Sequence, residues 1–340
     1  MVSSLLWLLL VLWVPRTARG VGEPLTTHPT WVVNAPLVFH HALDVAQLSL
    51  QDLVNVSQSE HESFFNYHIP RTDGFTDGEI VDVIEHFFWG RRKGLAMELG
   101  ALDGSSGTRS MTFELENTFG WKRILIEGNP TYVKALKARS PHALSVSAAI
   151  CDQERKVHFS DAAYVGGISE FMDEKFLQQY HAAVYNAQRD KTNVSSVDWS
   201  QPAVSALAHE IDCVPLATVL HKAHARHVNF FILDVEGGEL QVLRSVNWNE
   251  TRFDVLCIET DPPNRPQGFR DSIAAFLGQR GYVDYSGQQG RNSWFTHKSF
   301  VPSARPGLNA SCFNGVRKSE WSERWFANRR TPPFQACPIG

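Results

Sequence analysis

The sequence predicts an α/β fold of the Rossmann-like type, with a mostly parallel sheet of seven strands and helices on both faces. Three observations lead to this prediction. Short apolar runs alternate with segments of helical periodicity, glycines follow the first of these runs, and acidic residues stand at the ends of four of them. The length of 340 residues, with 43% hydrophobic and 20% charged content, suffices for one such domain with flanking segments.

The expected elements follow one another as strand and helix along most of the chain. Strands are predicted over 95–99, 123–126, 144–150, 230–235, 253–258, 281–285 and 293–296. Helices are predicted over 79–88, 106–118, 131–138, 173–187 and 269–279, with Gly120 ending the second. We expect a main domain over 76–300 with an insertion at about 160–210, an N-terminal extension over 21–75 and a C-terminal tail over 301–340.

The N-terminus has the features of a secretory signal peptide. Residues 5–14 form an apolar run, and Ala18 and Gly20 supply small residues at the −3 and −1 positions of a cleavage site. We interpret residues 1–20 as this signal, whether it is cleaved or kept as an anchor. The run is short for a membrane span, so we expect no stable insertion after cleavage and a place in the endoplasmic reticulum or Golgi lumen or outside the cell.

N-glycosylation triplets and cysteines are also relevant to passage through the secretory pathway. Three cysteines lie in or beside apolar strand-like runs, where a buried thiol is the ordinary interpretation, and two lie in the tail, where a disulfide could close a loop. The buried thiols are expected at Cys151, Cys213 and Cys257, and the candidate disulfide joins Cys312 and Cys337. N-glycosylation triplets begin at Asn55, Asn193, Asn249 and Asn309.

Four acids, Glu98, Glu127, Asp234 and Glu259, stand at or near the carboxyl ends of separate predicted strands. In an open parallel sheet these ends line the ligand crevice. Clustered carboxylates repel one another unless solvent, a metal or a cationic ligand offsets them. S-adenosylmethionine carries two positive groups and no phosphate, so the pattern favours it over NAD. The net charge of −4 without a basic stripe argues against nucleic acid.

The first turn of this crevice runs from Glu98 to Gly104 as E-x-G-x-x-x-G. Glycines at 100 and 104 would let the backbone approach a ligand closely, and serines at 105 and 106 suit the start of the next helix. Glu127, one βαβ unit later, can accept both hydroxyls of a ribose. Asp152, after the third strand, is a candidate partner for an adenine amino group.

These residues resemble the FkbM-type methyltransferases, which use S-adenosylmethionine and have the class I methyltransferase fold. The similarity covers about residues 90–300. It lies in five successive blocks: 98–104, I-L-I-E-G-N-P at 124–130, Ala148-Ala149, I-L-D-V-E-G-G-E at 232–239 with Leu243, and Ile258-Glu259. One departure is Leu233, where many relatives carry lysine, which questions any catalytic or substrate role of that position.

The resemblance implies methyl transfer to an oxygen, commonly a hydroxyl on a sugar or natural product. Together with the residue pattern it defines a candidate cofactor site and a candidate catalytic pair. Asp234 and Glu236 are the candidate catalytic bases, because they follow the central strand. The candidate cofactor-binding residues are Glu98, Gly100, Asp103, Gly104, Glu127, Asn129, Ala149, Asp152 and Asp234.

Several alternatives stay open at this point. Glu236 and Glu239 could instead serve the first turn of the next helix, which for Glu239 is the favoured interpretation. His209 and His297 are alternative bases. No metal is expected, although Asp234, Glu259 and Asp261 are oxygen ligands of the kind that Mg²⁺ takes.

The function expected from the sequence is O-methylation, by S-adenosylmethionine, of a hydroxyl on a glycan or small metabolite in the secretory pathway. The alternative is an inactive luminal or secreted binding protein that has kept the fold. An NAD-dependent oxidoreductase is disfavoured, because the third glycine of the phosphate-binding turn is missing at its usual spacing.

Overall fold

The computed structural model describes residues 39–40, 54–55, 79–105, 110–188, 197–260, 265–285 and 291–304. All of them belong to one compact unit, Val33–Gly340. The expected signal peptide, the tail cysteines Cys312 and Cys337, and the acceptors Asn193 and Asn309 lie outside the described residues, as does Asp261. None of the described helices is long and apolar enough to cross a bilayer.

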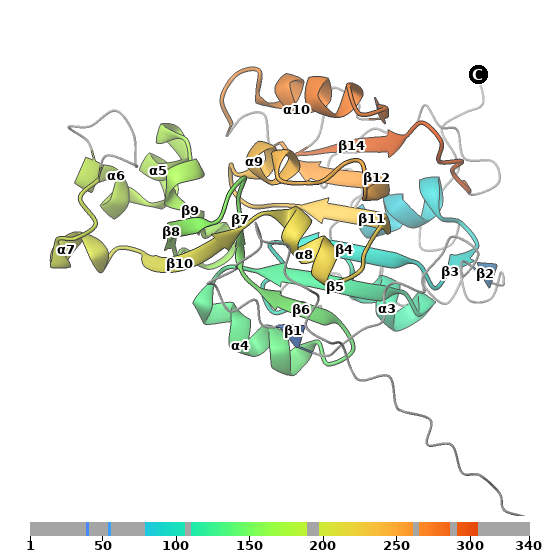
Figure 1. Ribbon diagram of the computed structural model, residues 1–340, viewed down its shortest axis with the longest axis horizontal. Coiled ribbons are helices and arrows are strands. Elements are labelled where there is room, and N and C mark those ends of the chain that lie inside the picture. Colours follow the sequence, from blue (N-terminus) through green and yellow to red (C-terminus); the bar gives the residue numbers. More distant parts are fainter. Residues whose placement is uncertain are drawn as a thin grey trace, which may run out of the picture. The chain divides into compact units, whose positions relative to one another are not determined.

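The main sheet has the strand order β1-β6-β5-β4-β11-β12-β14-β13 (Figure 1). The strands β4, β5, β6, β11 and β12 are parallel, whereas β14 runs antiparallel between β12 and β13. The seven predicted strands are therefore present, and the short β1 adds an antiparallel edge beside β6. Their bounds are β1 Phe39–His40, β4 Leu95–Leu99, β5 Lys122–Glu127, β6 Leu144–Ser147, β11 His227–Leu233, β12 Arg252–Glu259, β13 Tyr282–Asp284 and β14 Asn292–His297.

Helices cover both faces of this sheet because side chains alternate along each buried strand. Leu95, Met97 and Leu99 of β4 share one apolar cluster with α8, α9 and α10, whereas Ala96 packs with α2, η4 and α3 on the other face. Leu136 of α4 packs on Leu125 of β5. The bounds are α2 Glu79–Asp82, η4 Val83–Phe87, α3 Phe113–Phe119, α4 Pro130–Arg139, α8 Leu216–Lys222, α9 Glu239–Arg244 and α10 Phe269–Gly278.

The predicted strand 144–150 is in fact two strands in two sheets. It divides after Ser147, and β7 pairs instead with β10 in a four-stranded sheet of order β7-β10-β8-β9. This sheet and α5, α6 and α7 stand together in Figure 1 and include the predicted insertion. The bounds are β7 Ala149–Ile150, β8 Arg155–Ser160, η6 Ala163–Val165, β9 Gly167–Ile168, η7 Ser169–Phe171, α5 Glu174–Tyr180, α6 Ala182–Gln188, α7 Pro202–Ser205 and β10 His209–Val214.

A disulfide between Cys151 and Cys213 corrects the prediction that both are free thiols. Cys213 lies opposite Ala149 in the β7–β10 pair, so Cys151, two residues later, reaches it with a Cα–Cα distance of 5.8 Å. Both side chains are fully buried. The bond spans 62 residues and closes the base of the insertion. Cys257 is a buried thiol, as predicted.

Two further elements differ from prediction in detail. The helix predicted over 106–118 begins at Phe113 and ends, as expected, at Gly120, which has a φ of 66°. The two-residue strand β2, Val54–Asn55, pairs antiparallel with β3, Arg91–Arg92.

Candidate active site

The structure confirms that the four predicted acids stand at the carboxyl edge of the parallel strands. Glu98 is the penultimate residue of β4, and Glu127 and Glu259 end β5 and β12. Asp234 directly follows β11, and its amide donates to the carbonyl of Leu99 at 3.2 Å. The acids therefore come from four strands to one edge, where open α/β sheets bind their ligands.

Glu98 is buried and is held by the segment that leads into α3. Its carboxylate accepts hydrogen bonds from Ser110 Oγ and Thr112 Oγ1, both at 2.6 Å, and from the amide of Met111 at 3.0 Å. Burial raises the pKa of Glu98, and these hydrogen bonds and the nearby Arg123 act in the opposite direction. Because Glu98 fixes residues 110–112 in this way, the helix α3 begins later than predicted, at Phe113.

The two glycines of the first turn are required by contacts within the chain. Gly100 has a φ of +87°, and a Cβ there would lie 2.0 Å from the carbonyl oxygen of Asp234. Gly104 has a φ of +67°, and its Cβ would lie 2.4 Å from Ser140 Oγ and 2.6 Å from Leu125 Cδ1. Both glycines were predicted to allow the close approach of a ligand. The structure supplies a nearer reason, which is the packing of this turn against Asp234 after β11, against β5 and against the end of α4.

Asp103, in the same turn, is 1% exposed and uses both of its oxygens within the chain. Oδ1 accepts from the amide and the hydroxyl of Ser105 at 3.0 and 2.7 Å, and Oδ2 pairs with Arg139. These contacts give Asp103 a role in holding the turn against α4. Its contact with a cofactor remains a prediction.

Glu127 joins the first turn to the second. Its Oε2 accepts from the amide of Leu102 at 2.7 Å, and its Oε1 accepts from the amide of Asn129 at 2.6 Å. Burial raises its pKa to about 7 despite these amides. Asn129 caps α4 through Thr131, and its amide nitrogen donates to Asp161 at 3.2 Å. The amide of Gly128 also bonds to this carboxylate, so three amides hold it and one of its four acceptor positions is left for a ligand.

The end of the third strand differs from the prediction. Ala149 is buried in β7, in the second sheet, although the amide of Ala148 still donates to the carbonyl of Glu127 at 3.0 Å. Asp152 is exposed and forms an ion pair with Arg155 at 2.9 Å. The structure therefore places Asp152 in a surface pair beyond the second sheet, and adenine recognition by it remains a prediction.

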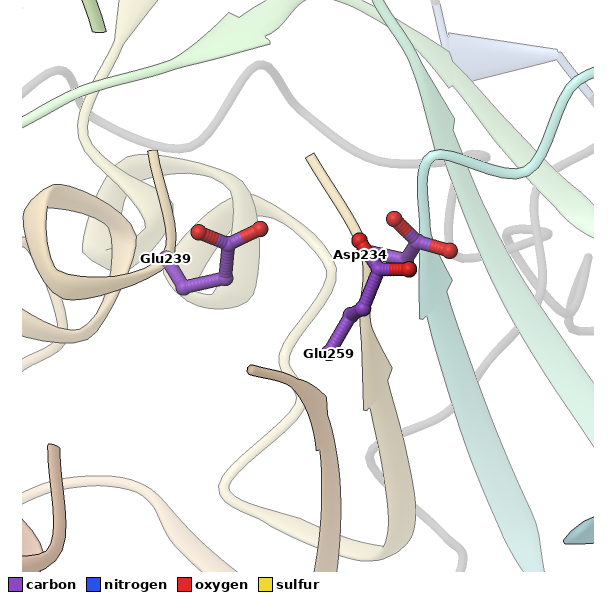
Figure 2. Close-up of side chains that lie close together, drawn as sticks. All are labelled: Asp234, Glu239 and Glu259. Atoms are coloured by element: carbon purple, nitrogen blue, oxygen red, sulfur yellow. The ribbon is translucent and has the colours of Figure 1, made fainter. Parts of the chain in front are cut away.

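Asp234 and Glu259 face each other at the ends of β11 and β12 (Figure 2). They share a side-chain hydrogen bond. Burial raises the pKa of Asp234 well above its usual range, and the charges of Glu259, Glu236 and Glu239 raise it further. Two carboxyl groups this close resist carrying two negative charges at once.

Arg265, which was not predicted from the sequence, supplies positive charge to this cluster. Its Nη2 lies 2.8 Å from Glu259 and 2.9 Å from Glu236, and 3.9 Å from Glu239. Glu259 also pairs with Arg291 at 2.5 Å. The chain thus offsets its own acids, so their clustering alone does not require a cationic ligand. No motif marks Arg265, and the available signal was the need for a counter-charge to four acids.

The two other glutamates of the block at 234–239 have different roles. Glu239 is fully buried and accepts from the amides of Val235 and Gly237 at 3.1 to 3.2 Å, which agrees with its favoured interpretation as a residue of the helix start. Glu236 pairs with Arg265, and burial together with the charge of Glu259 raises its pKa to about 8. Glu236 therefore stays with Asp234 as a candidate base.

A metal ion is the other way to offset these acids. Asp234, Glu239 and Glu259 each place one carboxylate oxygen within 4.8 Å of the others (Figure 2). Oxygen ligands in this arrangement suit a hard divalent cation. Arg265 already contacts Glu259 and lies 3.9 Å from Glu239, so its guanidinium occupies the same surroundings.

The remaining candidates lie elsewhere. His297 ends β14, whose antiparallel course places it near the start of β12, and it hydrogen-bonds Ser299 at 2.7 Å. His209 is an exposed residue of β10 in the second sheet. Leu233 is fully buried in the main core with α8, α9 and α10, which rules out contact with a substrate from this position in the structure described.

The strand order and the acids at its carboxyl edge define a class I methyltransferase fold. Omitting the edge strand β1, the order β6-β5-β4-β11-β12-β14-β13, with β14 antiparallel, has its reversal between β4 and β11. In doubly wound sheets the ligand binds at such a reversal. Glu98 and Asp234 stand on either side of it.

The chain belongs to the FkbM methyltransferase family. The model of the methyltransferase FkbM domain matches residues 98–283, more than half of the chain. This range includes all four acids, Arg265 and the insertion. No curated protein matches the sequence.

Solved structures with a similar course of the chain include three methyltransferases. Methyltransferase FkbM from Methylobacillus flagellatus KT is 12% identical, with a TM-score of 0.35, over 60% of this chain and 44% of that one. Precorrin-6y C5,15-methyltransferase from Geobacter metallireducens GS-15 is 10% identical, with a TM-score of 0.27, over 60% and 78%. A human methyltransferase 10 domain containing protein is 9% identical, with a TM-score of 0.27, over 74% and 88%. The chain thus spans less than half the length of the first of these structures.

Proposed function

We propose that the protein transfers a methyl group from S-adenosylmethionine to a hydroxyl oxygen of a glycan or small metabolite. The observation that carries the proposal is Glu127. The amides of Leu102, Gly128 and Asn129 orient its carboxylate, and one of its acceptor positions is left for a ligand. An oriented carboxylate at the end of the second strand suits a ribose hydroxyl. The residues present therefore fit a nucleoside cofactor.

The catalytic part of the proposal rests on Asp234. S-adenosylmethionine, when bound, supplies an electrophilic methyl group. The acceptor hydroxyl must lose a proton, and Asp234 is the carboxyl group at the end of the central strand that can take it. Glu259, fixed by Arg265 and Arg291, orients Asp234 through their shared hydrogen bond. Because the pKa of Asp234 lies well above its usual range, we expect the rate to rise with pH until Asp234 is ionised.

Two observations support the location in the secretory pathway. The disulfide between Cys151 and Cys213 is of the kind that forms and persists in oxidising compartments. Asn249, which begins a glycosylation triplet between α9 and β12, is exposed. We expect the secreted protein to lose mass on treatment with an N-glycosidase and the Asn249→Gln variant to lose less. No mass change in either would contradict passage through the lumen.

Binding and turnover are tested separately. S-adenosylmethionine and its demethylated product should raise the melting temperature, whereas NAD should not; indifference to all three contradicts the proposal. Methyl transfer from labelled cofactor to a panel of glycans and small alcohols should be lost in Asp234→Asn and Glu127→Ala. Signal that survives both substitutions excludes these residues as the site. Binding without any transfer by the wild type favours the alternative of an inactive binding protein, in keeping with Leu233.

A further inference from the structure

The edge of the main sheet opposite the candidate catalytic acids is basic. Residues 221–227, which run from the end of α8 to the start of β11, read H-K-A-H-A-R-H. Short basic runs of this kind are typical of surfaces that bind polyanions. The chain as a whole has a net charge of −4, so the total conceals a difference in charge between the two edges of the sheet.

Basic residues that are distant in the sequence join this run at the amino ends of the strands. Arg252 begins β12, and its amide donates to the carbonyl of Arg226 at 3.0 Å. Lys298 follows β14, and its amide donates to the carbonyl of Gly281, next to Arg280, at 2.9 Å. We call this group the amino-edge basic face. It consists of His221, Lys222, His224, Arg226, His227, Arg252, Arg280, His297 and Lys298.

Two guanidinium groups of the amino-edge basic face are held in fixed positions. Nη2 of Arg252 lies 3.1 Å from Nε2 of His227 and 3.5 Å from Oδ1 of Asp254. Nη1 of Arg280 donates to the carbonyl of Phe276 at 2.7 Å, and the guanidinium lies 3.5 Å from the centre of the Phe276 ring. A guanidinium that is already fixed loses little conformational freedom when it binds an anion, and its planar donors suit an oxyanion.

The positive charge of this face is only partly offset by the chain itself. Lys222, Arg226 and Lys298 form no ion pair with any residue that the structure describes. The segments that carry the face contribute two acids beside it, which are the exposed Glu250 and the fully buried Asp254. The face has five lysines and arginines, and its histidines add further hydrogen-bond donors. An anionic ligand would therefore meet a net positive surface.

We propose that the amino-edge basic face binds a sulfated polysaccharide. Each sulfate group carries a negative charge and oxygens that accept hydrogen bonds from guanidinium and ammonium groups. The basic side chains come from the ends of β11, β12 and β14 and from the segments that follow α8 and α10. Neighbouring strands lie about 4.8 Å apart, so the positive charges are spread along the edge as sulfates are along an extended polysaccharide. This ligand is separate from the methyl acceptor, because Glu98 and Asp234 stand at the opposite edge.

The choice of this polyanion rests on the proposed location in the secretory pathway. The anionic lipids that attract basic protein segments belong to the cytoplasmic leaflet, which a protein in the lumen or outside the cell does not meet. Sulfated polysaccharides are the polyanions of the late secretory pathway and the cell surface. Anionic membranes are the competing ligand, and the experiment includes them.

The test compares two double variants of the full chain. Arg226→Glu with Lys298→Glu reverses two exposed charges of the face. The matched control is Lys134→Glu with Lys175→Glu, which makes the same change in net charge at exposed positions of α4 and α5. The probe is a heparin octasaccharide, with its desulfated form and vesicles containing phosphatidylserine as comparisons. Dissociation constants are measured over a range of salt concentrations after N-linked glycans are removed from the protein.

We expect the wild type to bind the octasaccharide, with an affinity that falls as salt rises, and not to bind its desulfated form. The double variant of the face should bind about tenfold or more weakly, with a salt dependence reduced by about two charges, whereas the control should change the affinity less than about threefold. No binding of the octasaccharide, equal losses in both double variants, or tighter binding to the vesicles overturns the inference.

Binding of the demethylated cofactor is measured on the same proteins and separates this inference from the proposed function. Both double variants should bind the cofactor as the wild type does, because the substitutions lie away from the carboxyl edge. If the cofactor binds while the octasaccharide does not, only the inference about the amino-edge basic face fails. If the octasaccharide binds while the cofactor does not, only the proposed methyl transfer fails.

Discussion

Replacing both Cys151 and Cys213 with alanine removes a disulfide that spans 62 residues. In the chain-entropy description, a loop of this length restricts the unfolded chain by an amount worth about 4 kcal/mol at 25 °C. The free energy of unfolding should fall by about that much. With a slope of about 3 kcal/mol per molar urea, the midpoint of unfolding should fall by about 1.3 M.

The assay is urea unfolding followed by tryptophan fluorescence, with and without a thiol reductant. The reductant should lower the midpoint of the wild type by much more than that of the double variant, which keeps only the candidate tail disulfide. Cys257→Ala is the matched control, because it removes a buried sulfur outside the bridge and should keep the response to reductant. A double variant within about 0.3 M of the wild type, or a wild type indifferent to reductant, would refute the loop-closure reasoning.

Three further predictions concern the turn and the acids. Gly100→Ala should destabilise the protein by about 3 kcal/mol or more, because its Cβ would meet the carbonyl of Asp234 at 2.0 Å. The control Gly120→Ala, whose Cβ has nothing within 4 Å, should cost about 1 kcal/mol, and the urea midpoints of the two variants test the difference. Burial raises the pKa of Glu127 to about 7, and we expect the ribose hydroxyls to bind its ionised form. Calorimetry should then show that the demethylated cofactor binds about tenfold more tightly at pH 8 than at pH 6. An affinity that does not change with pH would contradict this. Arg265→Gln should lower the free energy of unfolding by about 3–5 kcal/mol, since it leaves buried acids uncompensated, and a loss below about 1 kcal/mol would show that they are neutralised otherwise.

The Arg265 variant also has a predictable dependence on pH. The pKa of Glu236 is raised by folding to about 8, so the folded protein binds more protons than the unfolded chain between the usual range of a glutamate and pH 8. The free energy of unfolding therefore falls as the pH rises through that range. Removing Arg265 raises the pKa of the remaining acids, which should steepen the fall in urea midpoints measured from pH 6 to pH 8.

The sequence was sufficient for the main sheet and for the position of its acids. Glu98, Glu127 and Glu259 were predicted at strand ends because apolar runs and their boundaries are local features, and the structure has them there. The helix stop at Gly120 was likewise local. The point at which a strand passes from one sheet to the other is not a local feature. The run at 144–150 is continuously apolar, and the division after Ser147 depends on pairing with β10, some 60 residues away.

The same distance in sequence explains what was missed at the site. A cysteine in an apolar strand has the same pattern whether it is a thiol or half of a disulfide, and only the pairing of β7 with β10 brings Cys151 to Cys213. Arg265 stands in no periodic segment, so nothing local distinguishes it from a surface arginine. The glycines at 100 and 104 were recognised as unusual, but their reason lies in Asp234, Ser140 and the other residues that pack on them.

The disulfide and the candidate catalytic acids are connected through the insertion. The insertion leaves the main domain at Cys151 and returns at Cys213, and between these points Phe171 packs on Gly237 and Gly238 of the block at 234–239. Glu127 and the first turn are held by contacts outside this loop, through Leu102 and Asn129. Opening the disulfide should therefore disturb the block at 234–239 while leaving the nucleoside contacts in place. Reduction should slow methyl transfer more than it weakens cofactor binding, and equal losses would show that both depend on the same part of the fold.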